Sequence, residues 1–382
     1  MIPLSIPNLQ GNEWKYIKEC LDTNWVSSVG SFVDRFETAL QEFTGAKHAV
    51  ACVNGSAALH ISLKLAGVER DDYVLVPNLT FVASANTITY CNAAPIFLDV
   101  EPRTWQLDLD LLSEFLDNKT FLDEKGELRL TENRRRIKAI MPVHVLGNML
   151  DMNRLLEICE QFHLTIVEDS TEALGSYYKG QHAGTFGKLG CLSFNGNKII
   201  TTGGGGIILS NEEELALKAK HITTQAKASK QEYFHDEIGY NYRLVNLLAA
   251  MGVAQMEQLP TILLRKKEIN QFYRTQLESI EGIRFQEQLE RADVNHWLFT
   301  ILTSRKAALL EHLQKNRIQA RPFWVPMNQL PMFAHCQYIQ NKDHSNQLYE
   351  KAISIPCSSG ITDAELVQVK DSIQEFFQHS SL

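Results

Sequence analysis

The feature that most constrains the fold is a repeated alternation of short apolar runs with stretches of helical periodicity. The apolar runs have the length of buried strands, and they cover residues 48–53, 73–76, 94–98, 137–141, 165–167 and 206–209. Apolar residues at helical spacing accompany them at 33–43, 57–66, 84–91 and 151–162. Strands that alternate with helices build a mostly parallel sheet covered on both faces, so the sequence predicts an α/β fold.

The pattern changes near residue 250. Two helical patterns follow, at 246–258 and 260–280, and a mixed stretch with a strand at 296–302 leads to the C-terminus. We therefore expect a large domain over residues 1–250 and a smaller α/β domain over residues 251–382. The polar segment 118–136 is expected to be a surface insertion in the first domain.

Composition excludes several classes of protein. The net charge of −8 over 382 residues argues against nucleic acid as the main partner. The basic run 134–136 is explained better by a solvent-facing surface than by a phosphate patch. The seven cysteines are widely spaced without a C-x-x-C pair, so we expect neither disulfides nor a metal site. No signal peptide and no run of membrane-spanning length can be read, which predicts a cytoplasmic protein.

A lysine in an apolar, glycine-rich setting is the strongest chemical signal. Lys198 lies five residues after Ser193 and just before the glycine run 203–206, and the pair Glu168-Asp169 lies about thirty residues upstream. This layout suits pyridoxal 5′-phosphate, because a lysine amine can bond to its aldehyde and a carboxylate can keep its ring nitrogen protonated. The alternatives are a solvated surface lysine and, for Asp169, the N-cap of a following helix.

Two further features can complete such a site. Asn54-Gly55-Ser56-Ala57 follows a predicted strand and opens a helix, where a hydroxyl and free amide groups favour a phosphate. A plain glycine turn with Ser56 as the N-cap is the alternative. Phe81 follows the next strand by a short loop. An aromatic ring there can stack on a flat heterocycle, and a core aromatic is the alternative.

The order of these features resembles the sugar-nucleotide aminotransferases of the DegT/StrS group, which have pyridoxal-phosphate fold type I. The motifs that carry the resemblance are Asn54-Gly-Ser-Ala-Ala-Leu, Pro77-Asn-Leu-Thr-Phe-Val-Ala, Glu168-Asp-Ser-Thr-Glu-Ala-Leu-Gly175, Ser193-Phe-Asn-Gly-Asn-Lys198 and Gly239-Tyr-Asn-Tyr-Arg-Leu. The resemblance extends from about Ile6 to the C-terminus. It implies a mostly parallel seven-stranded sheet between helices, with a smaller C-terminal α/β domain.

The resemblance also implies roles for single residues. Lys198 is the Schiff-base lysine and moves the proton during the transfer, and Asp169 pairs with the ring nitrogen. The phosphate is held by Ser56, Ser193 and the turn 55–57. The complete set of cofactor-binding residues implied is Gly55, Ser56, Ala57, Phe81, Asp169, Glu172, Ser193, Lys198 and Asn241.

Three implied roles concern the rest of the cleft. Phe81 matches the aromatic that stacks on the cofactor ring. Asn241 matches an asparagine that reaches the phosphate of the neighbouring subunit, which implies a homodimer with shared active sites. Glu172 stands where many relatives carry Gln or His near the ring hydroxyl, so its contact departs from the family pattern. The weaker candidates for the sugar pocket are Trp25, Trp324 and Asn328.

The reaction implied is amino transfer from glutamate, with release of 2-oxoglutarate, to C4 of a nucleotide-linked 4-keto-6-deoxy sugar. The sequence looks most like enzymes that act on UDP-linked 2-acetamido sugars for bacillosamine or legionaminic-acid-type surface glycans. Two alternatives stay open. A sugar dehydratase of the same fold carries a histidine at the position of Lys198, and a regulatory protein would bind the cofactor without turnover.

Overall fold

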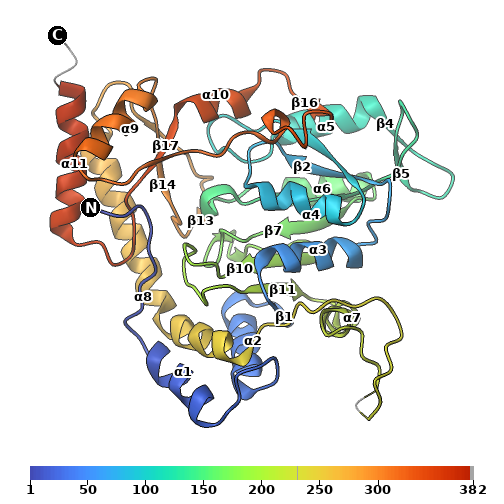
Figure 1. Cartoon of the computed structure of the whole chain (residues 1–382). Coiled ribbons are helices and arrows are strands. Elements are labelled where there is room, and N and C mark those ends of the chain that lie inside the picture. Colours follow the sequence, from blue (N-terminus) through green and yellow to red (C-terminus); the bar gives the residue numbers. More distant parts are fainter. Residues whose placement is uncertain (230, 379–382) are drawn as a thin grey trace.

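A computed structural model describes residues 1–229 and 231–378, and its centre is a mostly parallel eight-stranded sheet (Figure 1). The strand order is β1-β11-β10-β7-β6-β2-β3-β16, and β11 runs antiparallel to both of its neighbours. The bounds are β1 His48–Cys52, β2 Tyr73–Pro77, β3 Ala94–Leu98, β6 Ile137–Ile140, β7 Thr165–Asp169, β10 Leu189–Ser193, β11 Gly206–Ser210 and β16 Tyr338–Ile339.

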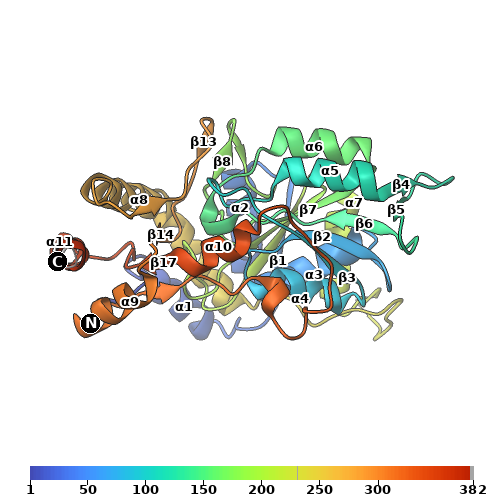
Figure 2. The ribbon, with the colours of Figure 1, turned by 90° about the horizontal axis from the view of Figure 1, so that it is seen from above.

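Helices cover both faces of this sheet (Figure 2). One face packs against α3 (Gly55–Leu65), α4 (Val82–Tyr90) and α7 (Glu213–Thr223), and the other packs against α5 (Leu109–Lys119) and α6 (Met152–Gln161). Each face has its own cluster of buried side chains, because strands enclosed on both sides must be apolar on both sides. The α/β fold predicted from the sequence is confirmed, with eight strands in place of seven. The eighth strand, β16, comes from the C-terminal part of the chain.

A single long helix, α8 (Asn246–Leu277), replaces the two helices expected after residue 246. Pro260 lies inside it, and proline removes one backbone hydrogen bond and favours a bend rather than a full break. The helix changes direction near its middle (Figure 1). The expected domain boundary near residue 250 falls within this helix. α8 is long and apolar enough to cross a membrane, but it packs against α1 (Glu13–Asp22) and α2 (Ser31–Thr44) as a core helix.

The C-terminal part forms a second, antiparallel sheet. Its strand order is β12-β14-β17-β15, and α9 (Lys306–Lys315) and α11 (Asp363–Gln378) pack against it around a third buried cluster. Its strands are β12 Arg284–Phe285, β14 Phe299–Leu302, β15 Arg321–Pro322 and β17 Ala352–Ile355. The strand expected at 296–302 starts later, because His296 has a φ of 52°, which extended strands do not adopt.

Small elements complete the fold. A hairpin of β4 (Thr120–Leu122) and β5 (Leu128–Leu130) forms the expected insertion. A three-stranded sheet contains β8 Tyr177–Tyr178, β9 Gln181–His182 and β13 Ala292–Asp293. The helix α10 (His344–Lys351) begins on the buried carboxylate of Asp99, which accepts bonds from the first two amides of the helix. This contact joins the C-terminal part to the end of β3.

Two of the three arginines in the basic run next to the insertion are partly buried in contacts with the protein. The guanidinium of Arg136 contacts three acidic side chains, including Asp72 at 2.8 Å. Arg135 lies over the ring of Tyr73 at 4.1 Å and donates to a backbone carbonyl. Arg134 lies over the ring of Phe121. The expectation of a solvent-facing run holds for Arg134, which is exposed, but it was wrong for Arg135 and Arg136, whose contacts fasten the insertion to the sheet.

Candidate functional site

A cavity of about 260 Å³ opens at the carboxyl ends of the central strands, where open α/β sheets bind ligands. It brings together seven of the residues singled out in the sequence, which come from five separate segments. These residues are Gly55, Ser56, Phe81, Asp169, Glu172, Ser193 and Lys198. The remaining lining residues are Asn54, Leu59, Thr80, Ala83, Ser84, Val143, Thr171, Asn195 and Gly204.

One end of the cavity is the N-terminus of α3. Asn54 is the N-cap, and its Oδ1 accepts the amide of Ala57 at 2.7 Å, so Ser56 is not the cap. Gly55, Ser56 and the adjacent Ser193 line this end of the cavity. The first amides of a helix have no acceptor inside the helix and carry its positive dipole end. This end of the cavity suits a phosphate.

Glycine is required where α3 meets the sheet. A Cβ on Gly55 would lie 2.8 Å from the Cβ of Ser193 and 3.3 Å from a methyl of Thr171. A Cβ on Gly206 would lie 2.4 Å from the carbonyl oxygen of Asn54. The two glycines therefore let the helix start, β10 and β11 approach one another, which places Ser193 beside the amides of the turn.

Lys198 is held in a closed turn after β10. The amide of Phe194 donates to Gly205 at 2.8 Å, and the amide of Thr202 returns to Phe194 at 3.0 Å, so the loop closes on itself. The indole N–H of Trp297 donates to the carbonyl of Asn197 at 2.7 Å. The position of the lysine is thus fixed both by its own loop and by a residue of the C-terminal part.

The amine of Lys198 points into the protein. Its side chain is 13% exposed, and Nζ lies 3.7 Å from Oε1 of Glu172. On another side, Nζ lies 4.3 Å from the ring centre of Trp297, within cation–π range. The surface-lysine alternative is excluded by this geometry, because an amine that serves only solubility would extend into water.

The two acidic side chains at the end of β7, Glu168 and Asp169, lie on opposite faces of the sheet. Asp169 faces the cavity, where it accepts the hydroxyl of Ser84 at 2.6 Å and the amide of Thr171 at 3.2 Å. Turns rather than a helix follow it, so it is not a helix N-cap. Glu168 points the other way and is fully buried. Consecutive residues of a strand face opposite sides, so Asp169 alone serves the site.

Glu168 is a structural carboxylate with four partners. Its Oε1 accepts the amides of Phe186 and Gly187 at 2.7 and 2.6 Å. Its Oε2 accepts the amide of Gly184 at 2.9 Å and lies 3.0 Å from Nε2 of His144. A carboxylate buried with this many donors is stabilised by them and fixes the loop after β9.

Glu172 is the unusual group in the cavity. It is buried, and its Oε2 accepts the amide of Leu146 at 2.8 Å. Leu146 has a left-handed backbone with φ 61° and ψ 19°, which costs a non-glycine residue on the order of 1–3 kcal/mol. Burial raises the pKa of Glu172 to about 7, against the opposing charge of Lys198 and with the help of nearby Asp169. The carboxyl is therefore poised between its charged and neutral forms near neutral pH.

A second cavity of about 590 Å³ adjoins the first through Phe81. The ring of Phe81 is 52% exposed and contacts Trp324 edge to face at 6.2 Å between ring centres. Trp324 also stacks on Trp297 at 6.3 Å. The polar side chains on the wall of this cavity include Gln319 and Arg321. The two cavities together make one cleft, with Phe81 lining both parts.

Five residues singled out in the sequence do not line the first cavity, and one of them, Trp324, lines the second. The amide of Ala57 is committed to Asn54. Asn241 is exposed, between Tyr240 and Tyr242, whose rings stack at 5.1 Å. The last two lie elsewhere: Trp25 is exposed near the start of α2, and Asn328 exchanges two hydrogen bonds with Asn78 at 2.9 Å.

Two residues of the site were missed in the sequence. Ser84, which binds Asp169, lies one helical turn after Phe81, and this spacing was a usable signal. Trp297, which clamps the lysine loop, carried no sequence signal, because its contact depends on how the C-terminal part folds back.

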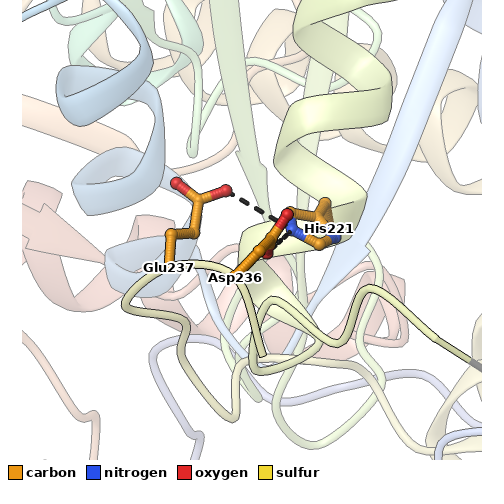
Figure 3. A group of neighbouring side chains, drawn as sticks. All are labelled: His221, Asp236 and Glu237. Carbon is orange, nitrogen blue, oxygen red and sulfur yellow. Dashed lines mark hydrogen bonds and ion pairs between the residues drawn. The ribbon is translucent and has the colours of Figure 1, made fainter. Parts of the chain in front are cut away.

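A separate cluster of possible ligands lies away from this cleft (Figure 3). His221 on α7 contacts Asp236 at 2.7 Å and Glu237 at 3.4 Å, in a geometry that could hold a cation. However, the ammonium of Lys218 already pairs with Glu237. The cluster is explained as an ion-pair network that fastens the loop after α7.

The donor set of the main cavity fits pyridoxal 5′-phosphate. The amine of Lys198, the carboxylate of Asp169, the N-terminus of α3 with Ser56, and Ser193 at the end of β10 all line one cavity. These are the groups required to bond to an aldehyde, to hold a ring proton and to bind a phosphate.

Comparisons with known proteins place the chain in an aminotransferase family. Residues 7–374 match the DegT/DnrJ/EryC1/StrS aminotransferase family. The chain is 36% identical over 381 residues to the GDP-perosamine synthase of Escherichia coli O157:H7, with 98% of each chain covered. It is 29% identical over 381 residues to the UDP-4-amino-4,6-dideoxy-N-acetyl-beta-L-altrosamine transaminase of Campylobacter jejuni, with 98% of this chain and 96% of that protein covered. The structure of Streptococcus pneumoniae Spr1654 in its PLP form shares the fold, with a TM-score of 0.89 at 22% identity over 99% of both chains.

Proposed function

The chain belongs to the DegT/DnrJ/EryC1/StrS aminotransferase family, and on this basis we propose that it moves an amino group from glutamate to C4 of a nucleotide-linked 4-keto-6-deoxy sugar. The product would enter a bacterial surface glycan. The single observation that carries this proposal is the cavity in which Lys198, Asp169 and the start of α3 converge. Such a site needs an amine, a fixed carboxylate and a phosphate cradle at once, and a structural cavity needs none of them.

The cofactor is pyridoxal 5′-phosphate, which when bound supplies an electron sink and carries the amino group between substrates. Lys198 would anchor it, and once released would move a proton between the carbons of cofactor and substrate. Asp169, oriented by Ser84, would hold the proton of the ring nitrogen. Ser56 and Ser193 would bind the phosphate at the helix start. Phe81 would lie against the ring.

The second cavity supports a large sugar-nucleotide substrate. It is wider than the cofactor cavity and continues it past Phe81. Trp324 offers an apolar face beside Phe81, and Arg321 and Gln319 offer donors for an anionic or polar group. We propose that the sugar lies between Phe81 and Trp324 and that the nucleotide diphosphate extends toward Arg321.

The relatives favour a GDP-linked sugar as the first candidate. The GDP-perosamine synthase is 36% identical to this chain. The altrosamine transaminase, whose name indicates a UDP-linked N-acetyl sugar, is 29% identical. The sequence resemblance pointed instead to UDP-linked 2-acetamido sugars and legionaminic-acid-type glycans, and this remains the second candidate.

Product analysis tests the function directly. Full-length protein with glutamate is offered 4-keto-6-deoxy sugars linked to GDP, UDP or dTDP, and the products are identified by mass spectrometry. We expect one nucleotide series to gain an amine in place of the keto oxygen, with one 2-oxoglutarate released per amine formed, and K198M to form none. Loss of a sugar hydroxyl without amine gain would favour a dehydratase. Cofactor binding without any 2-oxoglutarate would favour a regulatory protein.

We also propose a cytoplasmic homodimer with shared sites. Large apolar side chains are exposed in two segments, and exposed apolar side chains can mark a surface that binds a partner. They are Trp25, Val29, Tyr233, Phe234 and Ile238. Asn241 is exposed, so its side chain is available to a second copy of the chain. All seven cysteines lie in the described residues and are free, which suits a reducing compartment.

A further inference from the structure

We propose that Glu172 is the proton partner of Lys198. When the lysine is not attached to the cofactor, its ammonium gives a proton to Oε1 of Glu172 and later takes it back. In this step an N–H bond breaks, an O–H bond forms, and the electron pair stays on nitrogen. The lysine thereby becomes a neutral amine without releasing a proton to water. This inference rests on the proposed function, since it concerns the lysine that performs it.

The contact between the two groups is specific. Nζ of Lys198 and Oε1 of Glu172 are 3.7 Å apart, and both side chains are shielded from water. A torsion of the flexible lysine chain closes the remaining gap to hydrogen-bond distance. Trp297 lies on another side of the amine at 4.3 Å. The indole face stabilises the cation but cannot accept its proton, so Glu172 is the acceptor within reach.

The orientation of the Glu172 carboxyl is fixed by a backbone hydrogen bond. Its other oxygen, Oε2, is occupied by the amide of Leu146 at 2.8 Å, which leaves Oε1 to the lysine. That amide is aimed by the left-handed backbone of Leu146, and Gly147 follows with φ 78°. The strained backbone of Leu146 positions the amide that bonds to Glu172. Backbone strain of this kind is concentrated at functional sites, which indicates that the orientation of the Glu172 carboxyl matters to function.

The surroundings of Glu172 favour its neutral form, in which the carboxyl carries a proton. Burial together with Asp169 raises the pKa of Glu172 to about 7, and the ammonium of Lys198 opposes that rise. The other titratable groups nearby are committed elsewhere. Asp169 binds Ser84 at 2.6 Å, and His144, next to Leu146, faces Glu168 at 3.0 Å. A buried carboxyl accepts a proton more readily than an exposed one, because burial disfavours its charged form.

Chemical labelling of the lysine tests the proposal. Full-length protein is loaded with pyridoxamine 5′-phosphate, which leaves the lysine unattached, and is pulsed with acetic anhydride over a range of pH. The acetylated fraction of Lys198 is measured by peptide mass spectrometry. In E172Q we expect the midpoint pH of labelling to fall by about one unit, which is a change of about tenfold in reactive amine at neutral pH. Gln keeps an oxygen for the amide of Leu146, so the fold should persist.

Two controls separate this role from a structural one. Glu37 is also buried, accepts the amide of Ala51 at 2.9 Å and faces Lys220 at 3.1 Å, but it does not line the cleft. E37Q should leave the labelling midpoint of Lys198 unchanged. In the reciprocal experiment, infrared titration of K198M should show the carboxyl of Glu172 losing its proton at a higher pH than in the parent.

The outcomes decide between the inference and the function on which it rests. An unshifted labelling midpoint in folded E172Q, or an equal shift in E37Q, would overturn the proton-sharing role. If glutamate still yields 2-oxoglutarate in the parent protein, the aminotransferase function stands even then. If E172Q shifts the labelling midpoint of Lys198 but the parent protein releases no 2-oxoglutarate from glutamate, the proton-sharing role stands and the aminotransferase function is refuted. If E172Q does not fold, E172D should restore a midpoint close to that of the parent, and failure to do so counts against the inference.

Discussion

The neighbouring carboxylates Glu168 and Asp169 should respond in opposite ways to the same substitution. E168Q should destabilise the protein and spare the chemistry of properly folded molecules. D169N should spare stability and abolish amino transfer. The difference follows from the strand, which directs Asp169 into the cavity and Glu168 into the loop after β9.

The cost of E168Q can be worked from its hydrogen bonds. The carboxylate accepts three backbone amides and faces His144. If the side-chain nitrogen of the new glutamine takes the position of Oε1, the backbone amides of Phe186 and Gly187 lose their acceptor. If that nitrogen takes the position of Oε2, the backbone amide of Gly184 loses its acceptor. Each bond to a charged group is worth about 1.5–3 kcal/mol, so the free energy of unfolding should fall by about 2–5 kcal/mol.

D169N should behave differently because its contacts survive. Asn keeps an oxygen for the amide of Thr171, and its amide nitrogen can donate to Ser84, whose hydroxyl can turn to Thr80 at 3.0 Å. The cost in stability should stay within about 1 kcal/mol. The lost charge is a different matter. A contact ion pair at an effective dielectric constant of 20 is worth about 4 kcal/mol, so the rate of transfer should fall about a thousandfold.

The assay has two parts. Urea unfolding gives the free energy of unfolding of each variant, calculated with the same dependence on urea concentration for all of them. The rate of 2-oxoglutarate release per folded molecule gives the activity. The reasoning would be refuted by a D169N protein that loses as much stability as E168Q, or by an E168Q protein that folds fully and loses the same activity as D169N. Either result would mean that the two side chains are not divided between the faces of the sheet as described.

Three further predictions follow from the site. G55A should weaken cofactor binding at least tenfold, measured by fluorescence titration, because its methyl would lie 2.8 Å from Ser193 and must push the phosphate turn away. W297F should lower the free energy of unfolding by about 1–3 kcal/mol and speed proteolysis near Lys198, because it removes the bond to Asn197. In the folded protein the pKa of Glu172 is raised to about 7 from its ordinary value of 4.5. Between these two pH values the folded state binds more protons than the unfolded state, so the stability that this group contributes should fall as pH rises from 4.5 to 7. Urea unfolding of E172Q should lack this part of the pH dependence, and a pH profile identical to that of the parent would contradict the prediction.

The sequence predicted those parts of the fold that depend on local pattern. Six strands of the main sheet were found from apolar runs bounded by turns. β10 (Leu189–Ser193) was missed as a strand, because it is short and interrupted by Gly190, which packs against the backbone of Gly184. The division between Glu168 and Asp169 could have been predicted from the two-residue period of a strand. From the sequence, Asp169 alone was assigned to the cofactor, and Glu168 was given no role.

The rest of the site depends on contacts between distant segments. Trp297 lies roughly a hundred residues after Lys198, and no local pattern joins them. The strained turn at Leu146 cannot be read from Val-Leu-Gly, since leucine has no preference for a left-handed backbone. Asn328 was singled out as a substrate residue by its motif, whereas its side chain is paired with Asn78. Such pairings appear only when the chain has folded.

The central claim is that the amine of Lys198 carries the cofactor in a cleft that also contains Asp169. The most direct measurement is reduction of the yellow, cofactor-loaded protein with borohydride, followed by peptide mapping. The cofactor should be found fixed to Lys198 alone, with the yellow colour lost. A cofactor fixed to another lysine, or none fixed at all, would contradict the account.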